Sequence, residues 1–174
     1  MTQRATPLFR PYLSADRSRC LDVFSSNVPR YFQEHERSEF ETFIDTSGCP
    51  YFVLALPEGV VGCGGYGQRE TGAPADLCWG MVAAAHHGSR LGEFLLLGRL
   101  AAIVRDQVAA SVRLVTTQHT DGFFRRYGFE IRSRVADGYG PGLDKVSMSL
   151  TLTVERRQWI QARFASIGAG PDGD

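Results

Sequence analysis

The sequence predicts an α/β fold in which helices pack on a mixed β-sheet. Short apolar runs of strand length alternate along the chain with longer segments whose apolar residues recur every three or four positions. Glycines and prolines separate these segments, and neither a linker nor an internal repeat interrupts them. The predicted order is β-α-α-β-β-β-α-β-α-β-β, which is typical of a single layered domain.

The first half of the chain is predicted to hold four strands and two helices. A short strand at 6–13 precedes the helical segment 14–29, in which Leu21 and Phe24 share one face. The segment 30–45 also carries apolar residues at helical spacing. Three further strands are predicted at 51–57, 60–68 and 77–82. A Glu-Gly turn joins the first two of these three, so they form a hairpin.

The second half is predicted to begin with a long buried helix at 89–110, where apolar side chains form a broad stripe. A short helix further on stops at Gly128. Three strands are predicted in this half, at 111–117, 129–139 and 145–154. We expect a single domain over 6–152, followed at 153–174 by a C-terminal helical extension and a frayed tail.

Composition excludes several classes of function. The chain carries 19 basic and 19 acidic residues, so no net field favours nucleic acid or a membrane surface. The cysteines have no metal-ligand spacing and imply no disulfide framework; they are Cys20, Cys49, Cys63 and Cys78. No signal-peptide core and no apolar run of membrane-spanning length occurs. We expect a cytoplasmic protein that binds neither metal, nucleic acid nor membrane.

The stretch HHGSRLG, residues 86–92, joins a predicted strand to the long helix. The N-terminus of a helix has unpaired backbone N–H groups and partial positive charge, and therefore holds phosphate well. Neither the nucleotide P-loop pattern nor the dinucleotide-binding glycine pattern is present. The turn is therefore a candidate anion site of another kind.

This part of the chain resembles motif A of the GCN5-related N-acetyltransferase (GNAT) superfamily. In WGMVAAAHHGSRLGEFLLLGRL, Gly92 matches the last position of the family turn [RQ]-x-x-G-x-[GA]. Arg90 stands where glycine is usual, and His87 where arginine or glutamine is usual. Arg90 either reaches a phosphate or lies solvated on the first helical turn, and the helix dipole favours the first alternative.

Other segments extend the resemblance over 6–152, to an uncharacterised bacterial branch. LVTTQHTDGFFRRYGFE is similar to the family's fifth strand and fourth helix, and VLALPEGVVGCGGYG to its central hairpin. GYGPGLDKVSMSL resembles the closing hairpin, and NVPRYFQEHERSEFETFI the first two helices. The resemblance implies the GNAT fold, a central, mixed, mostly antiparallel seven-stranded sheet flanked by about four helices.

The resemblance also implies a reaction, the direct transfer of an acetyl group from acetyl-CoA to a primary amine. We expect a small-molecule acceptor, such as a metabolite, an amino-acid-like compound or an antibiotic. Two alternatives remain open: a non-catalytic acyl-CoA-binding or sensing module, and acetylation of a protein or peptide amine. The family often pairs through its late strands, so a homodimer is compatible with the resemblance.

The resemblance assigns the coenzyme to the fourth strand, the turn and the segment that follows the fifth strand. Backbone groups of the strand would hold the pantetheine arm, and those of the turn the pyrophosphate. The implied coenzyme-binding residues are Met81, Val82, His87, Gly88, Ser89, Arg90, Leu91, Gly92, Thr117 and Phe124.

The catalytic groups depart from the family pattern. The usual acid that protonates the thiolate is a tyrosine, and its position is occupied by Phe124, which cannot donate a proton. The candidate substitutes are His119, at the end of the fifth strand, and Tyr139, which is alternatively a substrate contact. Thr117, Thr120 and Tyr127 are further candidates, and Tyr127 is alternatively a packed residue on the helix surface. Aromatic and polar residues are expected to line the acceptor site; they are Asn27, Tyr31, Phe32, Tyr66 and Trp79.

Overall fold

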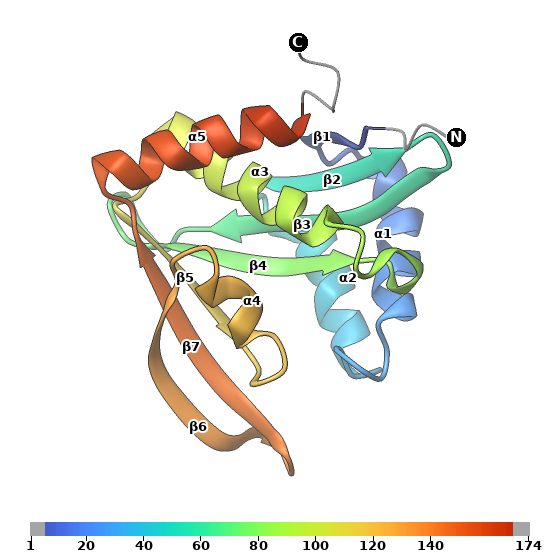
Figure 1. Cartoon of the computed structure of the whole chain (residues 1–174). Helices are drawn as coiled ribbons and strands as arrows, with labels where there is room; N and C mark the ends of the chain where they lie inside the picture. The colour runs from blue at the N-terminus through green and yellow to red at the C-terminus, as the bar shows by residue number, and fades with distance from the viewer. Residues whose placement is uncertain (1–5, 169–174) are drawn as a thin grey trace.

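The computed structural model describes residues 6–168, and these form one seven-stranded sheet with helices on both faces (Figure 1). The strands are β1 (Leu8–Pro11), β2 (Tyr51–Leu56), β3 (Gly59–Gly67), β4 (Ala75–Val82), β5 (Ser111–Thr116), β6 (Glu130–Gly140) and β7 (Leu143–Thr151). The α-helices of this part of the chain are α1 (Arg17–Ser26), α2 (Glu36–Thr46), α3 (Leu91–Asp106), α4 (Asp121–Arg125) and α5 (Val154–Gly168). The predicted fold class and element order are confirmed. The predicted tail at 169–174 lies outside the described residues.

The strands follow the order β1-β2-β3-β4-β5-β7-β6 across the sheet. Neighbouring strands run antiparallel except β4 and β5, which run parallel. This parallel pair is short, since only Ala75 pairs with Val112 and Asp76 with Arg113. Both strands continue beyond these residues, so the sheet opens between them.

Two layers of helices cover the sheet. Helices α1 and α2 lie behind it in the view of Figure 1, whereas α3 and α5 lie in front. The α1–α2 side buries an apolar cluster that includes Phe24, Phe40 and Met81. On the other side α3 is buried along most of its length, which explains its broad apolar stripe. The strong burial of α3 fixes its N-terminus against the sheet.

Gly98 allows α3 to approach β1 closely. A Cβ built on Gly98 would lie 2.5 Å from Cε2 of Phe9, a distance that no real side chain tolerates. Phe9 in turn stacks on Phe52 at a centroid distance of 4.8 Å and contacts Phe164 of α5 edge-on at 5.5 Å. Helix α5, predicted as an extension, therefore packs into the same core.

Some boundaries differ from the predicted ones. The helical segment predicted at 30–45 begins only at Glu36, because the chain from 27 to 33 forms turns and the Glu36 carboxylate accepts a hydrogen bond from the Gln33 N–H. Helix α3 begins at Leu91, after Arg90 in a left-handed conformation. Strand β4 begins two residues early, at Ala75, where it pairs with β5.

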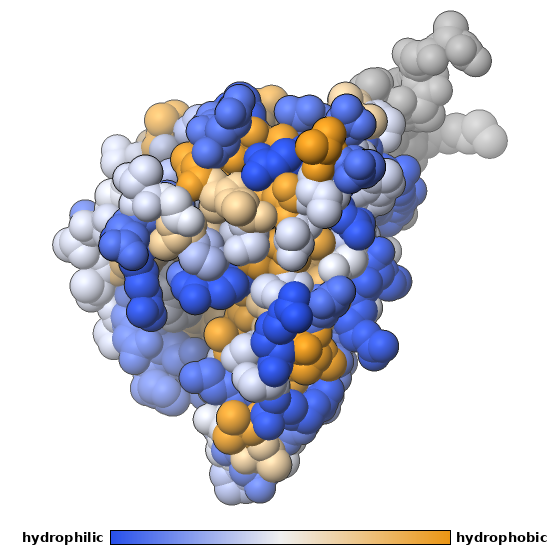
Figure 2. Space-filling view, turned by 90° about the vertical axis from the view of Figure 1, so that its left-hand side faces the viewer, coloured by the Kyte–Doolittle hydropathy of each residue, from blue (hydrophilic) through white to orange (hydrophobic). Residues whose placement is uncertain are grey.

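Strand β6 forms one edge of the sheet and is exposed along nearly its whole length. The face of the molecule on this side mixes hydrophilic and hydrophobic side chains (Figure 2). No helix in the described part of the chain is long and apolar enough to cross a bilayer. Residues 6–168 also contain no cluster of three His, Cys, Asp or Glu side chains arranged to hold a metal ion.

Candidate active site

The separation of β4 from β5 creates a cleft of about 860 Å³. Residues 77–82 of β4 and 114–116 of β5 lie beyond the last paired residues of the two strands. Side chains from the turn before α3, from α4, from 27–36 and from the β6–β7 hairpin complete the walls. Ligand-binding pockets commonly measure about 300–1,000 Å³. The cleft is therefore large enough to bury an extended small molecule.

A β-bulge shapes the β4 wall of the cleft. The register between β3 and β4 shifts between the pairs Cys63–Met81 and Gly65–Cys78, so β4 carries an extra residue there. Trp79, inside this bulge, has a φ of 44°, which bulky residues rarely adopt. The Tyr51 hydroxyl donates a hydrogen bond of 2.9 Å to the Trp79 carbonyl and supports this conformation. Bulges of this kind bend a strand and re-aim its side chains.

The turn before α3 is tied to the end of β4. Nε2 of His87 lies 2.9 Å from the Val82 carbonyl oxygen, and Nδ2 of Asn27 donates to the same oxygen at 2.9 Å. Gly88 has a φ of 80° and Arg90 a φ of 66°, so the chain coils tightly before the helix begins. The His87 and Asn27 side chains therefore brace the turn and face the cleft from its wall.

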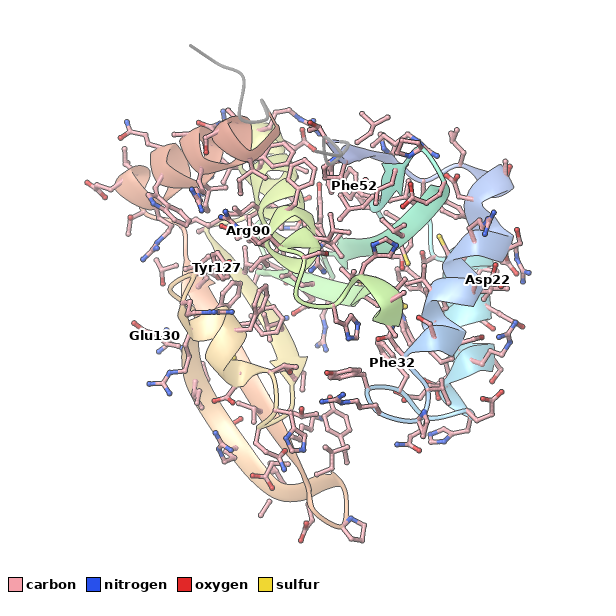
Figure 3. The ribbon with its side chains drawn as sticks, turned by 45° about the vertical axis from the view of Figure 1, so that its right-hand side comes forward. Asp22, Phe32, Phe52, Arg90, Tyr127 and Glu130 are labelled. Carbon is pink, nitrogen blue, oxygen red and sulfur yellow. The ribbon has the colours of Figure 1, made fainter. Side chains whose placement is uncertain are left out.

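Arg90 forms an ion pair at the N-terminus of α3. Its Nε and Nη2 atoms lie 2.9 and 2.8 Å from Oε2 of Glu93, while Arg163 of α5 donates to Oε1 of the same carboxylate at 2.8 Å. Burial opposes ionisation of Glu93, but the two arginines outweigh it and hold its pKa below the usual value. Two cations around one carboxylate leave net positive charge beside the helix N-terminus, where Arg90, Tyr127 and the start of α3 meet (Figure 3).

The wall formed by β5 and α4 is rich in hydroxyls. The Thr116 and Thr120 hydroxyls hydrogen-bond to each other, and both residues line the cleft with Thr117 and His119. The predicted coenzyme residue Phe124 also lines it, packed edge-on against Phe129 at 5.8 Å. Burial raises the pKa of Tyr127, another cleft residue, above its usual value.

Aromatic side chains gather on the wall of the cleft that 27–36 and β4 form, next to the turn before α3. Trp79 stacks with Phe32 at 5.9 Å, and Tyr31 contacts His87 edge-on at 5.4 Å. Tyr139, from β6, lines the same cleft, and burial together with the Glu36 carboxylate raises its pKa. Asn27, Tyr31, Phe32, Trp79 and Tyr139 thus lie in one cleft.

Three residues assigned to the site from the sequence have side chains elsewhere. Tyr66 is 4% exposed in the core under α3, with its hydroxyl 3.4 Å from Asp106, because its position on β3 faces α3. It does not line the cleft, which corrects its assignment as an acceptor contact. The Ser89 hydroxyl and N–H both donate to the His86 carbonyl, and the Leu91 side chain is buried in the core. Neither side chain is therefore directed at a ligand, and the Ser89 N–H is already bonded.

Arg99 lines the cleft although the sequence did not single it out. Its position on α3, within the apolar stripe, leaves it only 5% exposed. The sequence does carry a signal for this residue, because an arginine stands within a helix face that is predicted to be buried. Charged residues are almost never buried without a partner, so such an arginine is a candidate for a binding role.

No model of a known protein family and no curated protein matches this sequence. Solved structures do match. A protein of the GNAT acetyltransferase family from Desulfovibrio desulfuricans superposes with a TM-score of 0.72 at 23% identity, covering 84% of this chain and 99% of that one. The ribosomal-protein-S18-alanine N-acetyltransferase from Escherichia coli has a TM-score of 0.72 at 13% identity, covering 85% of this chain and 95% of its own.

An aminoglycoside 6'-N-acetyltransferase solved with coenzyme A has a TM-score of 0.68 at 13% identity, covering 83% of this chain and 96% of its own. At these identities the likeness concerns the arrangement of the backbone. It includes the seven-stranded sheet and nearly the whole length of each matched protein. The chain described here therefore has the fold of the GNAT N-acetyltransferases.

Proposed function

We propose that this protein is a GNAT N-acetyltransferase that moves an acetyl group from acetyl-CoA to a primary amine of a small molecule. The observation that carries the proposal is the cleft between β4 and β5, which is lined both by the N-terminus of α3 and by a cluster of aromatic side chains. A helix N-terminus favours phosphate, and aromatic side chains favour a compact organic acceptor. The structural neighbours include an enzyme solved with coenzyme A.

The features of the cleft fit coenzyme A as a co-substrate. The unpaired edges of β4 and β5 offer backbone groups to an amide-bearing arm such as pantetheine, near Met81 and Val82. The net positive charge around Glu93 lies where the pyrophosphate would be held by N–H groups of the turn. The N–H groups of His87 and Ser89 donate to the Ala84 and His86 carbonyls, so we assign this role to Gly88 and to residues 90–92. The Val82 carbonyl already accepts from Asn27 and His87, so we assign the N–H groups of this region to the coenzyme.

The reaction requires one bond to form and one to break. The neutral amine nitrogen attacks the thioester carbonyl carbon, the carbon–sulfur bond breaks, and the sulfur leaves as thiolate. The nitrogen loses one proton and the sulfur gains one, so the products are an amide and a free thiol. We assign this proton movement to His119 or Tyr139, which line the cleft and carry groups able to exchange protons.

A second candidate function, non-catalytic binding of acyl-CoA, is favoured by Phe124. This residue packs in the wall of the cleft and has no proton to donate. In that case coenzyme A would bind without turnover.

A titration followed by an activity assay separates the two functions. Acetyl-CoA is first titrated while the melting temperature is measured, and thiol release is then followed with a panel of primary amines. A rise in melting temperature together with thiol release supports the enzyme. A rise without release from any amine supports the binding module, and no rise at millimolar acetyl-CoA refutes both.

A further inference from the structure

Arg99 is a buried cation without a counter-ion. It is 5% exposed, and no carboxylate among residues 6–168 forms an ion pair with it. Its Nε donates to the Leu95 carbonyl at 3.3 Å, within its own helix. Burying a charge without a partner costs several kcal/mol, so such an arrangement is rare unless a ligand supplies the partner.

Two glycines make room for the Arg99 guanidinium beneath the β3–β4 pair. A Cβ built on Gly80 would lie 2.6 Å from Nη1 and 2.7 Å from Nη2 of Arg99. A Cβ on Gly64 would lie 3.2 Å from the same Nη1. Any larger residue at Gly80 would displace the guanidinium, so the backbone is adapted to hold it there.

This position brings the guanidinium to the floor of the cleft. Arg99 lines the cleft together with Leu77 and Gly80 of β4 and Leu114 of β5, which are the residues where the two strands diverge. It therefore lies apart from the net positive charge around Glu93 at the start of the same helix.

Two ionisable groups that face Arg99, Cys78 and Tyr51, supply no negative charge at neutral pH. Burial raises the pKa of Cys78 to about 12 and that of Tyr51 well above its usual value, so both are uncharged. Burial also lowers the pKa of Arg99, but a guanidinium stays protonated at neutral pH. The floor of the cleft consequently carries one uncompensated positive charge.

We propose that Arg99 binds the carboxylate of a substrate. The inference rests on the proposed acyl transfer and names its substrate class: one of the two reactants is a carboxylate. The carboxylate belongs either to the acyl group of the donor, as in a dicarboxylic acyl-CoA, or to the amine acceptor, as in an amino acid. A planar guanidinium matches a carboxylate with two parallel hydrogen bonds, which an acetyl group or a simple amine cannot form.

The test compares charged and neutral ligands in four proteins. They are the wild type, Arg99→Met, Arg99→Lys and the control Arg105→Met, which removes an exposed arginine paired with Asp106 on the same helix. Calorimetry measures the affinity for acetyl-CoA and succinyl-CoA. A second series, with coenzyme A present, compares amino acids with their amides.

The wild type and Arg105→Met are expected to prefer the carboxylate ligand by about tenfold or more in one of the two series. Arg99→Met is expected to lose this preference, and Arg99→Lys to retain part of it because it keeps the charge without the planar fork. Without ligand, Arg99→Met is expected to melt at a higher temperature than the wild type, since an apolar chain replaces an unpaired buried charge.

Equal affinity for charged and neutral ligands in both series overturns the Arg99 proposal, as does a preference that survives in Arg99→Met. Both of these results leave the proposed function intact as long as coenzyme A binds. Failure of all four proteins to bind coenzyme A refutes the proposed function itself and the Arg99 proposal with it. A lower melting temperature of ligand-free Arg99→Met also counts against the proposal, because it assigns the charge a structural role.

Discussion

The Glu93 carboxylate joins α3 to α5, and its neutralisation is expected to destabilise the fold measurably. Its side chain is 10% exposed. Its carboxylate oxygens lie 2.8 Å from Nη2 of Arg90 and 2.8 Å from Nη2 of Arg163. Glu93→Gln keeps the shape and one acceptor oxygen but removes the charge. Nothing else at the N-terminus of α3 changes in this variant.

The size of the effect follows from the exposure of the partners. Arg90 is 69% exposed, so its pair contributes only about 0.5 kcal/mol, near the middle of the range for surface pairs. Arg163 is 39% exposed and makes two hydrogen bonds to the carboxylate, for which about 1 kcal/mol is reasonable after screening by solvent. The helix dipole adds about 0.5 kcal/mol for an acid in the first turn. The sum is about 2 kcal/mol, or roughly 4–8 °C in melting temperature for a chain of this size.

The effect has a defined pH dependence. The folded-state pKa of Glu93 is lowered, so its contribution is fully present above the unfolded-state pKa, about 4.3, and is lost as the pH falls through the folded-state value. Melting temperatures of wild type and Glu93→Gln should therefore differ by a constant amount at neutral pH and converge at acidic pH. Glu130→Gln, at an exposed pair with Arg132, serves as the control and should change little. A pH-independent difference, or none at all, would refute this reasoning.

Three further predictions concern α3 and the cleft. Gly98→Ala should destabilise the protein by about 1–3 kcal/mol in urea unfolding, because the new methyl group clashes with the Phe9 ring. An unchanged urea midpoint would contradict this, because it would mean that the Phe9 side chain moves aside at no cost. Arg90→Gly should be more stable than Arg90→Ala by about 1 kcal/mol, since both lose the Glu93 pair but only alanine bears the left-handed penalty; equal melting temperatures would contradict this. His119→Ala should lower kcat in the thiol-release assay with little change in coenzyme A affinity, and an unaltered kcat would exclude His119 from proton transfer.

The order of elements was predictable because apolar periodicity reports burial directly. The stripe of 89–110 and the runs at 51–57 and 111–117 correspond to α3, β2 and β5, whose buried faces make the core. The start of α2 was not predictable in this way, because the turns at 27–33 depend on contacts that apolar spacing does not encode. The hydrogen bond from the Gln33 N–H to Glu36 is one of them.

The position of the turn before α3 was predictable from its motif, but the direction of its side chains was not. The sequence could not show that Arg163 shares the Glu93 carboxylate or that Asn27 donates to the Val82 carbonyl, since both depend on tertiary contacts. The bulge at Trp79 was equally hidden, because an aromatic residue is among the least expected at positive φ.

Tyr66 and Arg99 show how much depends on which face a residue occupies. Tyr66 was assigned to the acceptor site as an aromatic residue with a polar handle, yet its place on β3 turns it toward α3. Arg99 lies within an apolar helix, where the pattern predicts only core residues, yet the absence of side chains at Gly64 and Gly80 lets it reach the cleft. The first outcome follows from the face of β3 that Tyr66 occupies, and the second from the packing of α3 against two glycines of β3 and β4. Residue type alone reveals neither.

The most direct test of the central claim is a crystal structure of the protein with coenzyme A. The account predicts the pantetheine arm between β4 and β5, beside Met81 and Val82, with the pyrophosphate at residues 87–92 and the sulfur inside the cleft. Coenzyme A bound at any other place on the molecule, or β4 and β5 closed against each other in the complex, would contradict it.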